Sequence, residues 1–461
     1  MQGLHAFSRL SVKFDEPNLV SCAGLTAVMA LAESCQLPEL VAATVTVPGP
    51  AGANAAVKVP ALVAGMVAGA DCIEDMDLLR HGGMGRLFGG VRAPSTLGTF
   101  LRAFTFGHVR QLDAVAARVL VGLAGRSPLL GGGSPVAFVD IDDTVKQTYG
   151  YAKQGAGYGY SGVKGLNALL ATVSTPTNAP LIVATRLRKG SANSARGAAR
   201  LVGDAVRTAR KAGAGGMLIM RADSAYYSHR VVAAARAAGA HFSVTARMTR
   251  AVTRAIATID EKAWTPIRYP NAVWDDEEQR WVSDAEVAEV GFTAFTHRRQ
   301  AEHVTARLIV RRVRRLNPAS APGAGQGELF TAYRYHACFT DSPMTMLVAE
   351  SQHRGHAIVE QVHADLKNGP LAALPSGSFA ANSAWLVLAA IAFNLTRAAG
   401  ALASGVHAKA TTATVRAQLI CVPARLASSA RRMVLHLPRD WPWEPAWQQL
   451  FAAAHAPPVA A

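Results

Sequence analysis

Residues 136–142 read Val-Ala-Phe-Val-Asp-Ile-Asp, an apolar run that ends in two aspartates. Such a run predicts a buried strand, and the side chains of a strand alternate between its two faces. Asp140 and Asp142 therefore share one face, and Asp143 takes the other. Parallel sheets usually hold their ligands beyond the carboxyl ends of the strands. We predict Asp142 as a metal ligand and Asp140 as the second choice, with a solvated strand end as the alternative.

A second apolar run, Met-Leu-Ile-Met-Arg-Ala-Asp at residues 217–223, also leads straight into an aspartate. A buried strand that ends in this way predicts Asp223 as a second metal ligand. The alternative is that Asp223 caps the N-terminus of the next helix, which is a common role for this residue type.

A third acidic residue, Glu360, lies in a segment with helical spacing, residues 356–367. The spacing puts His356, Glu360 and Lys367 along one face and apolar side chains on another, which can pack on a sheet. Glu360 can then reach a metal and Lys367 a phosphate oxygen; the alternative is a surface helix with solvated charges. Two strand ends and one helix that converge with carboxylates provide what a two-metal phosphoryl-transfer site needs.

The composition favours a polyanionic partner. The 461 residues carry a formal net charge of +16, the pI is about 10.0, and 50% of the residues are hydrophobic. A chain with this balance can bury a large core and is expected to bind nucleic acid first and an anionic membrane second.

The cysteines indicate a reducing compartment. The five cysteines form no Cys-x-x-Cys pair, which argues against a zinc ribbon or a disulfide framework. We see no signal peptide and predict a cytoplasmic protein. The most apolar stretch, residues 384–393, is shorter than the about 20 residues that span a bilayer, so we predict a buried helix and no membrane partner.

The chain divides into five parts by its patterns. Residues 1–130 read as mostly helical, and the break at 105–107 could be the turn of a helix-turn-helix, with an ordinary helical hairpin as the alternative. After a glycine cluster, strands and helices alternate, which predicts an α/β fold with a mixed sheet flanked by helices. The parts are a helical N-terminal DNA-binding region at 1–130, the first part of the catalytic core at 131–248, a β-rich insertion at 249–342, the second part of the core with Glu360 at 343–405, and a C-terminal tail at 406–461.

Local patterns also predict individual elements. The predicted strands of the core are 137–142, 166–173, 181–186, 217–222 and 242–245. The predicted helices between them are 195–212 and 229–238. In the N-terminal region Ser95, after Pro94, is predicted to cap a helix over 97–103.

Together these features resemble the DDE transposases of bacterial insertion sequences. The resemblance is carried by the spacing of Asp142, Asp223 and Glu360, by the insertion before the glutamate, and by Glu-x6-Lys in the third segment. More narrowly, the chain resembles the cut-and-paste branch with a Tyr-x2-Arg-x3-Glu-x6-Lys signature, the insertion-sequence thirteen-eighty group. Supporting stretches are residues 93–102, 139–145, 149–150, 187–190, 221–227 and 422–426.

The resemblance implies an RNase H-like catalytic core that is split by the insertion. It implies two Mg2+ ions, for which Mn2+ can substitute, held by Asp142, Asp223 and Glu360. The implied reaction is the cleavage of transposon ends through DNA hairpins, followed by joining to target DNA. The implied partners are double-stranded DNA, as terminal repeats and as target, and a second copy of the chain in a homodimer assembled on DNA.

One segment departs from the family signature. The positions of the Tyr and the Arg are occupied by His353 and His356, and Arg354 is out of register. A protonated His356 could contact the same phosphate, and so could Arg354 after a small helix shift. Two other functions therefore stay open: a catalytically weakened DNA-binding protein derived from a transposase, and a structure-selective nuclease.

Basic and aromatic residues are predicted to contact DNA. Arginines and lysines bind phosphates, and an aromatic ring can stack on a base taken out of the duplex. The tryptophans of the insertion, which include Trp264, are candidates for this stacking, with a core role as the alternative for each. The predicted DNA-binding residues are Lys367, His356, Arg354, Arg188, Lys189, Trp274, Trp281, Arg311 and Arg312.

Overall fold

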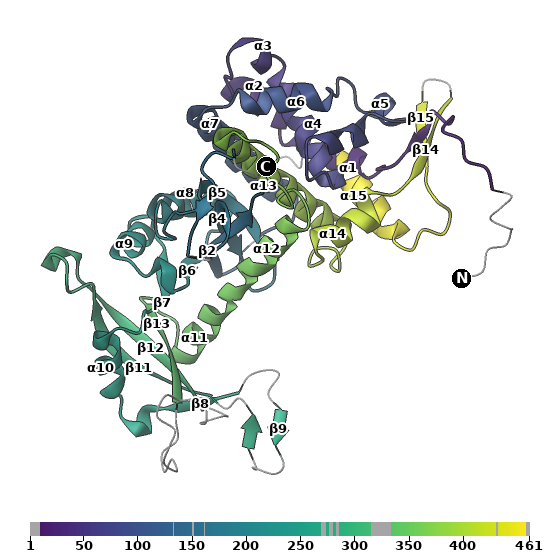
Figure 1. Ribbon diagram of the computed structural model, residues 1–461. Coiled ribbons are helices and arrows are strands. Elements are labelled where there is room, and N and C mark those ends of the chain that lie inside the picture. The colour runs from purple at the N-terminus through teal and green to yellow at the C-terminus, as the bar shows by residue number, and fades with distance from the viewer. Residues whose placement is uncertain are drawn as a thin grey trace.

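The computed structural model has three parts that lie in a row (Figure 1). A helical part joins the N-terminal helices to the C-terminal segment, an α/β part lies next to it, and an antiparallel extension continues from the α/β part. The structure describes residues 10–131, 133–149, 152–160, 162–268, 273–275, 280–282, 285–314, 333–429 and 432–457.

Five strands form the α/β part of a large sheet. They are β2 (Val136–Gln147), β4 (Lys164–Ser174), β5 (Leu181–Lys189), β6 (Met217–Ala222) and β7 (His241–Thr245). Their order is β5-β4-β2-β6-β7, in which β4 runs antiparallel to β2 and β5, whereas β6 and β7 run parallel to β2. Side chains of the central strands are buried nearly throughout, as expected where helices cover both faces. The predicted mixed sheet is confirmed.

The strands of the β-rich segment continue this sheet. Its last strand, β13 (Tyr333–Thr340), pairs antiparallel with β7, and β12 (Val304–Arg314), β11 (Ala285–Ala294) and β8 (Thr265–Ile267) follow in that order. The same segment also contains α10 (Arg250–Ala257) and a separate hairpin of β9 (Val273–Asp275) and β10 (Arg280–Val282). The α/β part and the β-rich segment therefore share one hydrogen-bonded sheet.

Helices cover this sheet. α8 (Ala198–Lys211) packs on β2, β4 and β5 with its apolar side chains buried, and α9 (His229–Ala237) packs on α8. α11 (Met346–Arg354) lies against β11 and β12, and α12 (Ile358–Lys367) lies against β2. One 3-10 turn at Gly355–Ala357 joins these two helices, so that they run end to end from the extension to the core (Figure 1).

The longest apolar helix is α13 (Phe379–Ala403). Its length and composition would suit a membrane span, yet 89% of its most apolar window is buried inside the protein. It packs on β5 and on helices of the helical part, so its apolar surface is used for the core. The predicted buried helix is confirmed and is longer than predicted.

The helical part is built around α13. Its longer helices are α1 (Leu25–Ser34), α2 (Leu37–Thr44), α4 (Ala55–Ala68), α6 (Pro94–Arg102) and α7 (Phe106–Arg126). The prediction that Ser95 caps a helix is wrong, because α6 begins at Pro94 and Ala93 precedes it without a side-chain cap. Pro94 instead starts the helix with a backbone angle that already suits it. Shorter helices are α3 (Gly49–Gly52) and α5 (Met84–Leu87).

The C-terminal segment completes the helical part. β1 (Leu19–Val20) pairs with β14 (Ala424–Ser429), which pairs with β15 (Arg432–His436). Helix α15 (Glu444–His455) packs on α1 and α13, and α14 (Thr412–Val415) packs on α13. Residues predicted as a C-terminal tail are therefore folded against the first helices of the chain.

Candidate active site

Asp142 and Asp223 lie side by side where the parallel pairing of β2 and β6 stops; β6 ends there, whereas β2 continues to Gln147 and so runs five residues past the predicted strand end. Ile141 of β2 is in register with Ala222 of β6, so each aspartate takes the next position along its strand. Neighbouring strands are about 4.8 Å apart, and residues in register on parallel strands point to the same side of the sheet. Asp142, Asp143 and Asp223 all line one cleft of about 840 Å³. We refer to this space, lined also by Asn167, Ser194 and Arg247, as the aspartate cleft.

Asp223 also caps a turn, as the alternative interpretation proposed. Its Oδ1 accepts a hydrogen bond of 3.0 Å from the backbone N–H of Ala225, which begins a 3-10 turn at Ser224–Tyr226. Only one carboxylate oxygen is used in this way. The other oxygen remains available for a ligand in the aspartate cleft.

The electrostatic surroundings of Asp223 favour a bound cation. Burial raises the pKa of Asp223, and the negative charges of Asp142 and Asp143 raise this pKa further, against the Ala225 hydrogen bond and His356. Like charges held together in this way disfavour the ionised form of Asp223. A divalent cation between the carboxylates would remove that repulsion.

Asp140, the second choice for a ligand, is fully buried and has a structural role. Arg221 of β6 binds both of its oxygens, at 2.7 and 2.6 Å, and His356 Nδ1 lies 3.0 Å from its Oδ1. Burial alone would raise the pKa of Asp140, but Arg221 and His356 hold this pKa below its usual value. Arg221 also lies 4.0 Å from the ring centre of Phe138. We refer to Asp140, Arg221 and His356 as the buried Asp140 cluster.

The buried Asp140 cluster fixes the break between α11 and α12. Arg221 Nη1 donates a hydrogen bond of 2.5 Å to the backbone oxygen of Gln352, near the end of α11. A Cβ atom at Gly355 would lie 2.8 Å from the same Nη1, so a side chain there would displace the guanidinium group. Through these contacts the cluster sets where α12, the helix of Glu360, begins.

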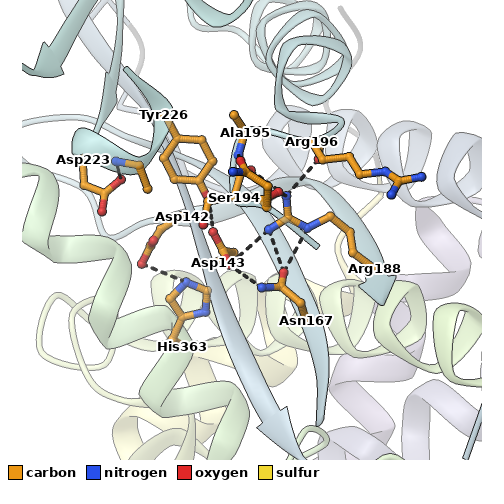
Figure 2. Close-up of polar contacts among 12 residues, drawn as sticks. Asp142, Asp143, Asn167, Arg188, Ser194, Ala195, Arg196, Asp223, Tyr226 and His363 are labelled. Atoms are coloured by element: carbon orange, nitrogen blue, oxygen red, sulfur yellow. Dashed lines mark hydrogen bonds and ion pairs between the residues drawn. The ribbon is translucent and has the colours of Figure 1, made fainter. Parts of the chain in front are cut away.

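Asp143 alternates with Asp142 along β2, yet its carboxylate lines the same cleft. Its carboxylate accepts hydrogen bonds from Tyr226 and Asn167, and Arg188 Nη2 lies 3.1 Å away. Figure 2 shows Asp143 and these partners beside Asp142 and Asp223. These contacts lower the pKa of Asp143 although burial alone would raise it.

Arg188 is used inside the protein, which contradicts its predicted contact with DNA. It is 6% exposed, and its donors bind Asn167 Oδ1 at 3.0 and 2.7 Å and the backbone oxygens of Ser194 and Arg196 at 2.6 and 2.9 Å. A guanidinium group whose donors are used in this way holds a loop in place and cannot also bind a phosphate. Lys189, the next residue, is exposed.

Helix α12 brings Glu360 to the same side of the sheet. His363, one turn after Glu360, has its Nε2 atom 3.4 Å from Asp142 Oδ2. Glu360 and Lys367 are both exposed. Within the described residues, Glu360 makes no hydrogen bond or ion pair, and the oxygens of the three predicted ligands do not all lie within 4.8 Å of one another.

This spacing tests the predicted ligand set. Two ions in a two-metal site lie about 3.5–4 Å apart, so ligands on different ions are farther apart than ligands on one ion. Asp142 and Asp223 are brought together, and Glu360 lies on the helix that contacts Asp142. Glu360 is not among the residues that line the aspartate cleft, so within the described residues the structure pairs two of the three predicted ligands and leaves the third on the neighbouring helix.

His353 and His356, at the two positions where the resemblance led us to expect Tyr and Arg, have internal partners. The ring nitrogens of His353 lie 2.9 Å from Ser243 Oγ and 2.9 Å from Thr245 Oγ1, which fixes α11 to β7. Burial above all, with nearby positive charges, lowers the pKa of His353 to about 3. His356 belongs to the buried Asp140 cluster through its Nδ1 atom, and its side chain is 15% exposed.

Three arginines predicted to bind DNA form ion pairs within the protein. Glu350 of α11 pairs with Arg354 at 2.9 Å and with Arg311 of β12 at 3.4 Å. Arg312 is 5% exposed, lies 4.3 Å from the ring centre of Trp264, and pairs with Glu286 at 2.7 Å. The prediction for Arg312 is wrong, because a buried guanidinium group stacked on a core tryptophan cannot reach DNA.

The tryptophans of the β-rich segment differ in exposure. Trp264 is 8% exposed and belongs to the core, as its alternative interpretation held. Trp274 on β9 is 41% exposed, and Trp281 on β10 is directly opposite in register. The side chain of Trp281 lies outside the described residues. Trp274 is therefore the candidate for base stacking whose described side chain is accessible.

The sequence analysis missed two residues that the structure brings to this region. Arg221 is a charged residue inside an apolar strand, and such a residue needs a buried partner. That signal was present in the run 217–223 and could have identified the pair with Asp140. His363, three residues after Glu360, lies on nearly the same face of a helix, which also could have been read from the spacing.

A family model described as transposase DDE domain group 1 matches residues 3–456. No curated protein matches the chain. The family match spans both aspartates of the cleft, Glu360 and the segment inserted between them.

Proposed function

Since the chain belongs to the family of DDE transposases, we propose that it cleaves transposon ends and joins them to target DNA by two-metal phosphoryl transfer. The observation that carries this proposal is that Asp142 and Asp223 take the positions directly after the parallel pairing of β2 and β6 and line one cleft. Their neighbours Asp140 and Asp143 have cationic partners within the protein. Within the described residues, Asp142 and Asp223 are the carboxylates of this strand pair that have no arginine partner, so we propose them as the ones that bind metal.

The ligands fit the proposed ions by their chemistry. Mg2+ prefers oxygen ligands and needs few carboxylates when waters and substrate phosphates complete its shell. Asp142, Asp223 and Glu360 supply such oxygens, and the repulsion that raises the pKa of Asp223 is what a cation would relieve. Bound ions, Mg2+ or Mn2+, would polarise the phosphate and activate the attacking oxygen.

The protein groups around the cleft would hold the DNA strand. Arg247 lines the cleft, and its Nε donates a hydrogen bond of 2.9 Å to the backbone oxygen of Ser224. Lys189 and Lys367 are exposed and carry positive charge for the phosphates on either side. We propose these three residues as contacts that orient the scissile phosphate.

We assign the core to the RNase H-like class. The order β5-β4-β2-β6-β7, with antiparallel strands on one side of β2 and parallel strands on the other, supports this assignment. The helix that carries Glu360 follows the β-rich segment, as expected for a split core of this kind. The helical N-terminal part is proposed as the region that recognises transposon ends.

Several finer features of the proposal rest on the family resemblance. We propose membership of the insertion-sequence thirteen-eighty group, hairpin DNA ends as intermediates, and a homodimer assembled on two ends in the cytoplasm. Trp274 is the proposed platform for the base that leaves the stack when a hairpin forms, because its ring is exposed. The histidines in place of the Tyr and Arg are compatible with activity, since both have structural partners.

The test is a cleavage and joining assay with Mg2+ on terminal-repeat DNA that has been selected by binding. Asp142→Asn, Asp223→Asn and Glu360→Gln should each abolish nicking and joining while DNA binding persists. Asp77→Asn, which changes an exposed carboxylate in the helical part, is the matched control and should stay active. Binding without any nicking by the wild type would favour a silent DNA-binding protein, and nicking without joining would favour a nuclease.

A further inference from the structure

His363 is a buried residue directed at the candidate metal site. The residue is 6% exposed, and its Nε2 atom lies 3.4 Å from Asp142 Oδ2 (Figure 2). Within the described residues, neither ring nitrogen of His363 makes a hydrogen bond. A buried polar atom without a partner costs about 1–3 kcal/mol, so such an atom requires an explanation.

Two other histidines of the described residues have polar partners at both ring nitrogens, whereas His229 Nδ1, like His363, makes no hydrogen bond and lies 3.6 Å from Glu302 Oε1. Both ring nitrogens of His353 lie 2.9 Å from hydroxyl groups. His407 has Ser404 Oγ at 2.8 Å and Gln418 Oε1 at 3.0 Å from its two ring nitrogens. His363 is equally buried but has only a carboxylate at a distance and angle that make no hydrogen bond. Packing alone therefore does not account for an imidazole at this position.

The position of His363 relative to Glu360 suits metal binding. The two residues are three apart on α12, a spacing that puts both on nearly one face of the helix. Glu-x-x-His pairs with this spacing bind metal ions in helical proteins. Ligand atoms that are each about 2.1 Å from one ion lie about 3 Å apart when they are at right angles, which is near the observed 3.4 Å.

We propose that His363 is a metal ligand that shares an ion with Asp142, an inference that rests on the proposed function of this site. The site would then offer an imidazole nitrogen as well as carboxylate oxygens. Imidazole favours first-row transition ions, whereas carboxylate and water suit Mg2+. The ion held by Asp142 and His363 is therefore expected to be bound more tightly as Mn2+ or Co2+ than as Mg2+.

The experiment uses the full-length protein with Mn2+ as the paramagnetic probe. Electron spin-echo spectroscopy of bound Mn2+ detects the magnetic coupling of a directly bound imidazole nitrogen, so the wild type should show this nitrogen signal. His363→Asn should lose the signal and weaken Mn2+ binding by at least about tenfold. His436→Asn changes an exposed histidine of β15 and should keep both the signal and the affinity.

The outcomes separate this inference from the proposed function. Mn2+ that binds in the wild type, is lost in Asp142→Asn and shows no nitrogen coupling would overturn the role of His363 and leave the carboxylate site intact. A nitrogen signal that persists in His363→Asn would overturn the role as well. Equal Mn2+ binding in the wild type and in Asp142→Asn would overturn both proposals. Because the signal is measured first in the wild type, a variant that fails to fold does not weaken the test.

Discussion

Asp140 and Asp142 are two residues apart on one face of β2, and the structure gives them opposite surroundings. Asp140 is fully buried, with both oxygens bound by Arg221 and one near His356. Asp142 is partly exposed in the aspartate cleft beside Asp223. The same strand thus carries one carboxylate, Asp140, that is bound by internal partners and another, Asp142, that is open to a ligand. Position along the strand, rather than residue type, decides which aspartate can bind metal.

The largest expected effect comes from removing the open carboxylate. Asp142→Asn should reduce DNA cleavage by about a thousandfold or more, because bound metal ions supply several kcal/mol of transition-state stabilisation. The thermal midpoint should hardly change, since Asp142 is not part of a buried ion pair. Cleavage rates and a melting curve on the same preparation check both parts. A large fall in stability would contradict the distinction between the two aspartates.

Replacing Asp140, the carboxylate with internal partners, should mainly lower the stability of the protein. Asp140→Asn leaves the guanidinium group of Arg221 buried without its counter-ion and should lower the free energy of unfolding by about 3 kcal/mol. Denaturant titration measures this loss. The double variant Asp140→Leu with Arg221→Met replaces the pair by apolar side chains and should recover part of the loss. If the double variant is no more stable than Asp140→Asn, the ion pair is not the cause.

The neutral histidine next to the buried Asp140 cluster should make the protein sensitive to acid. The pKa of His353 is lowered to about 3, so the unfolded chain binds a proton below about pH 6.5 while the folded protein does not. Stability is therefore present above pH 6.5 and lost as the pH falls, by about 1.4 kcal/mol per unit. Between pH 6.5 and 5 the loss should reach about 2 kcal/mol.

His353→Gln tests this pH dependence. Glutamine can hydrogen-bond to Ser243 and Thr245 but does not titrate in this range. Denaturant titrations at pH 6.5 and pH 5 should show a smaller difference for the variant than for the wild type. If the free energy of unfolding falls equally in the variant and in the wild type between pH 6.5 and pH 5, other groups control the acid sensitivity.

The smallest effect, on DNA affinity, is expected for Lys367 near the aspartate cleft. Lys367→Ala removes one exposed positive charge at the end of α12 and should weaken DNA binding a few-fold. The slope of log affinity against log salt should fall by about 1, the value for one phosphate contact. Binding titrations at three salt concentrations measure both quantities. Lys13→Ala, an exposed lysine near the start of the described chain, is the control and should leave the slope unchanged.

The elements that follow local patterns could be predicted from the sequence. β6 begins and ends at the predicted residues, whereas β2 continues five residues beyond its predicted end at Asp142, and Asp142 and Asp143 line one cleft although they alternate along the strand. These outcomes depend on the spacing of apolar side chains within about ten residues. The pairing of Asp142 with Asp223 was also accessible, because each aspartate directly follows an apolar run and these runs form the parallel pair of β2 and β6.

The partners of charged residues could not be predicted in the same way. Arg188 and Lys189 look alike in sequence, yet Arg188 is buried by Asn167 and loop carbonyls and Lys189 is exposed. Such partners are brought together by the fold, across tens of residues. The pairing of β13 with β7 likewise joins strands that are far apart in the sequence. Local patterns do not say at which edge of the sheet such a strand is added.

The pairing of β1 with β14 has a consequence for how the protein is made. Residues 19–20 leave the ribosome about four hundred residues before the strand that completes their sheet. Part of the apolar surface of the first helices therefore stays exposed until α13, α14 and α15 have been translated. In a truncated product the N-terminal helices would lack the C-terminal elements that cover their apolar surface. Truncation should therefore yield a polypeptide that chaperones and proteases recognise rather than a separate DNA-binding fragment.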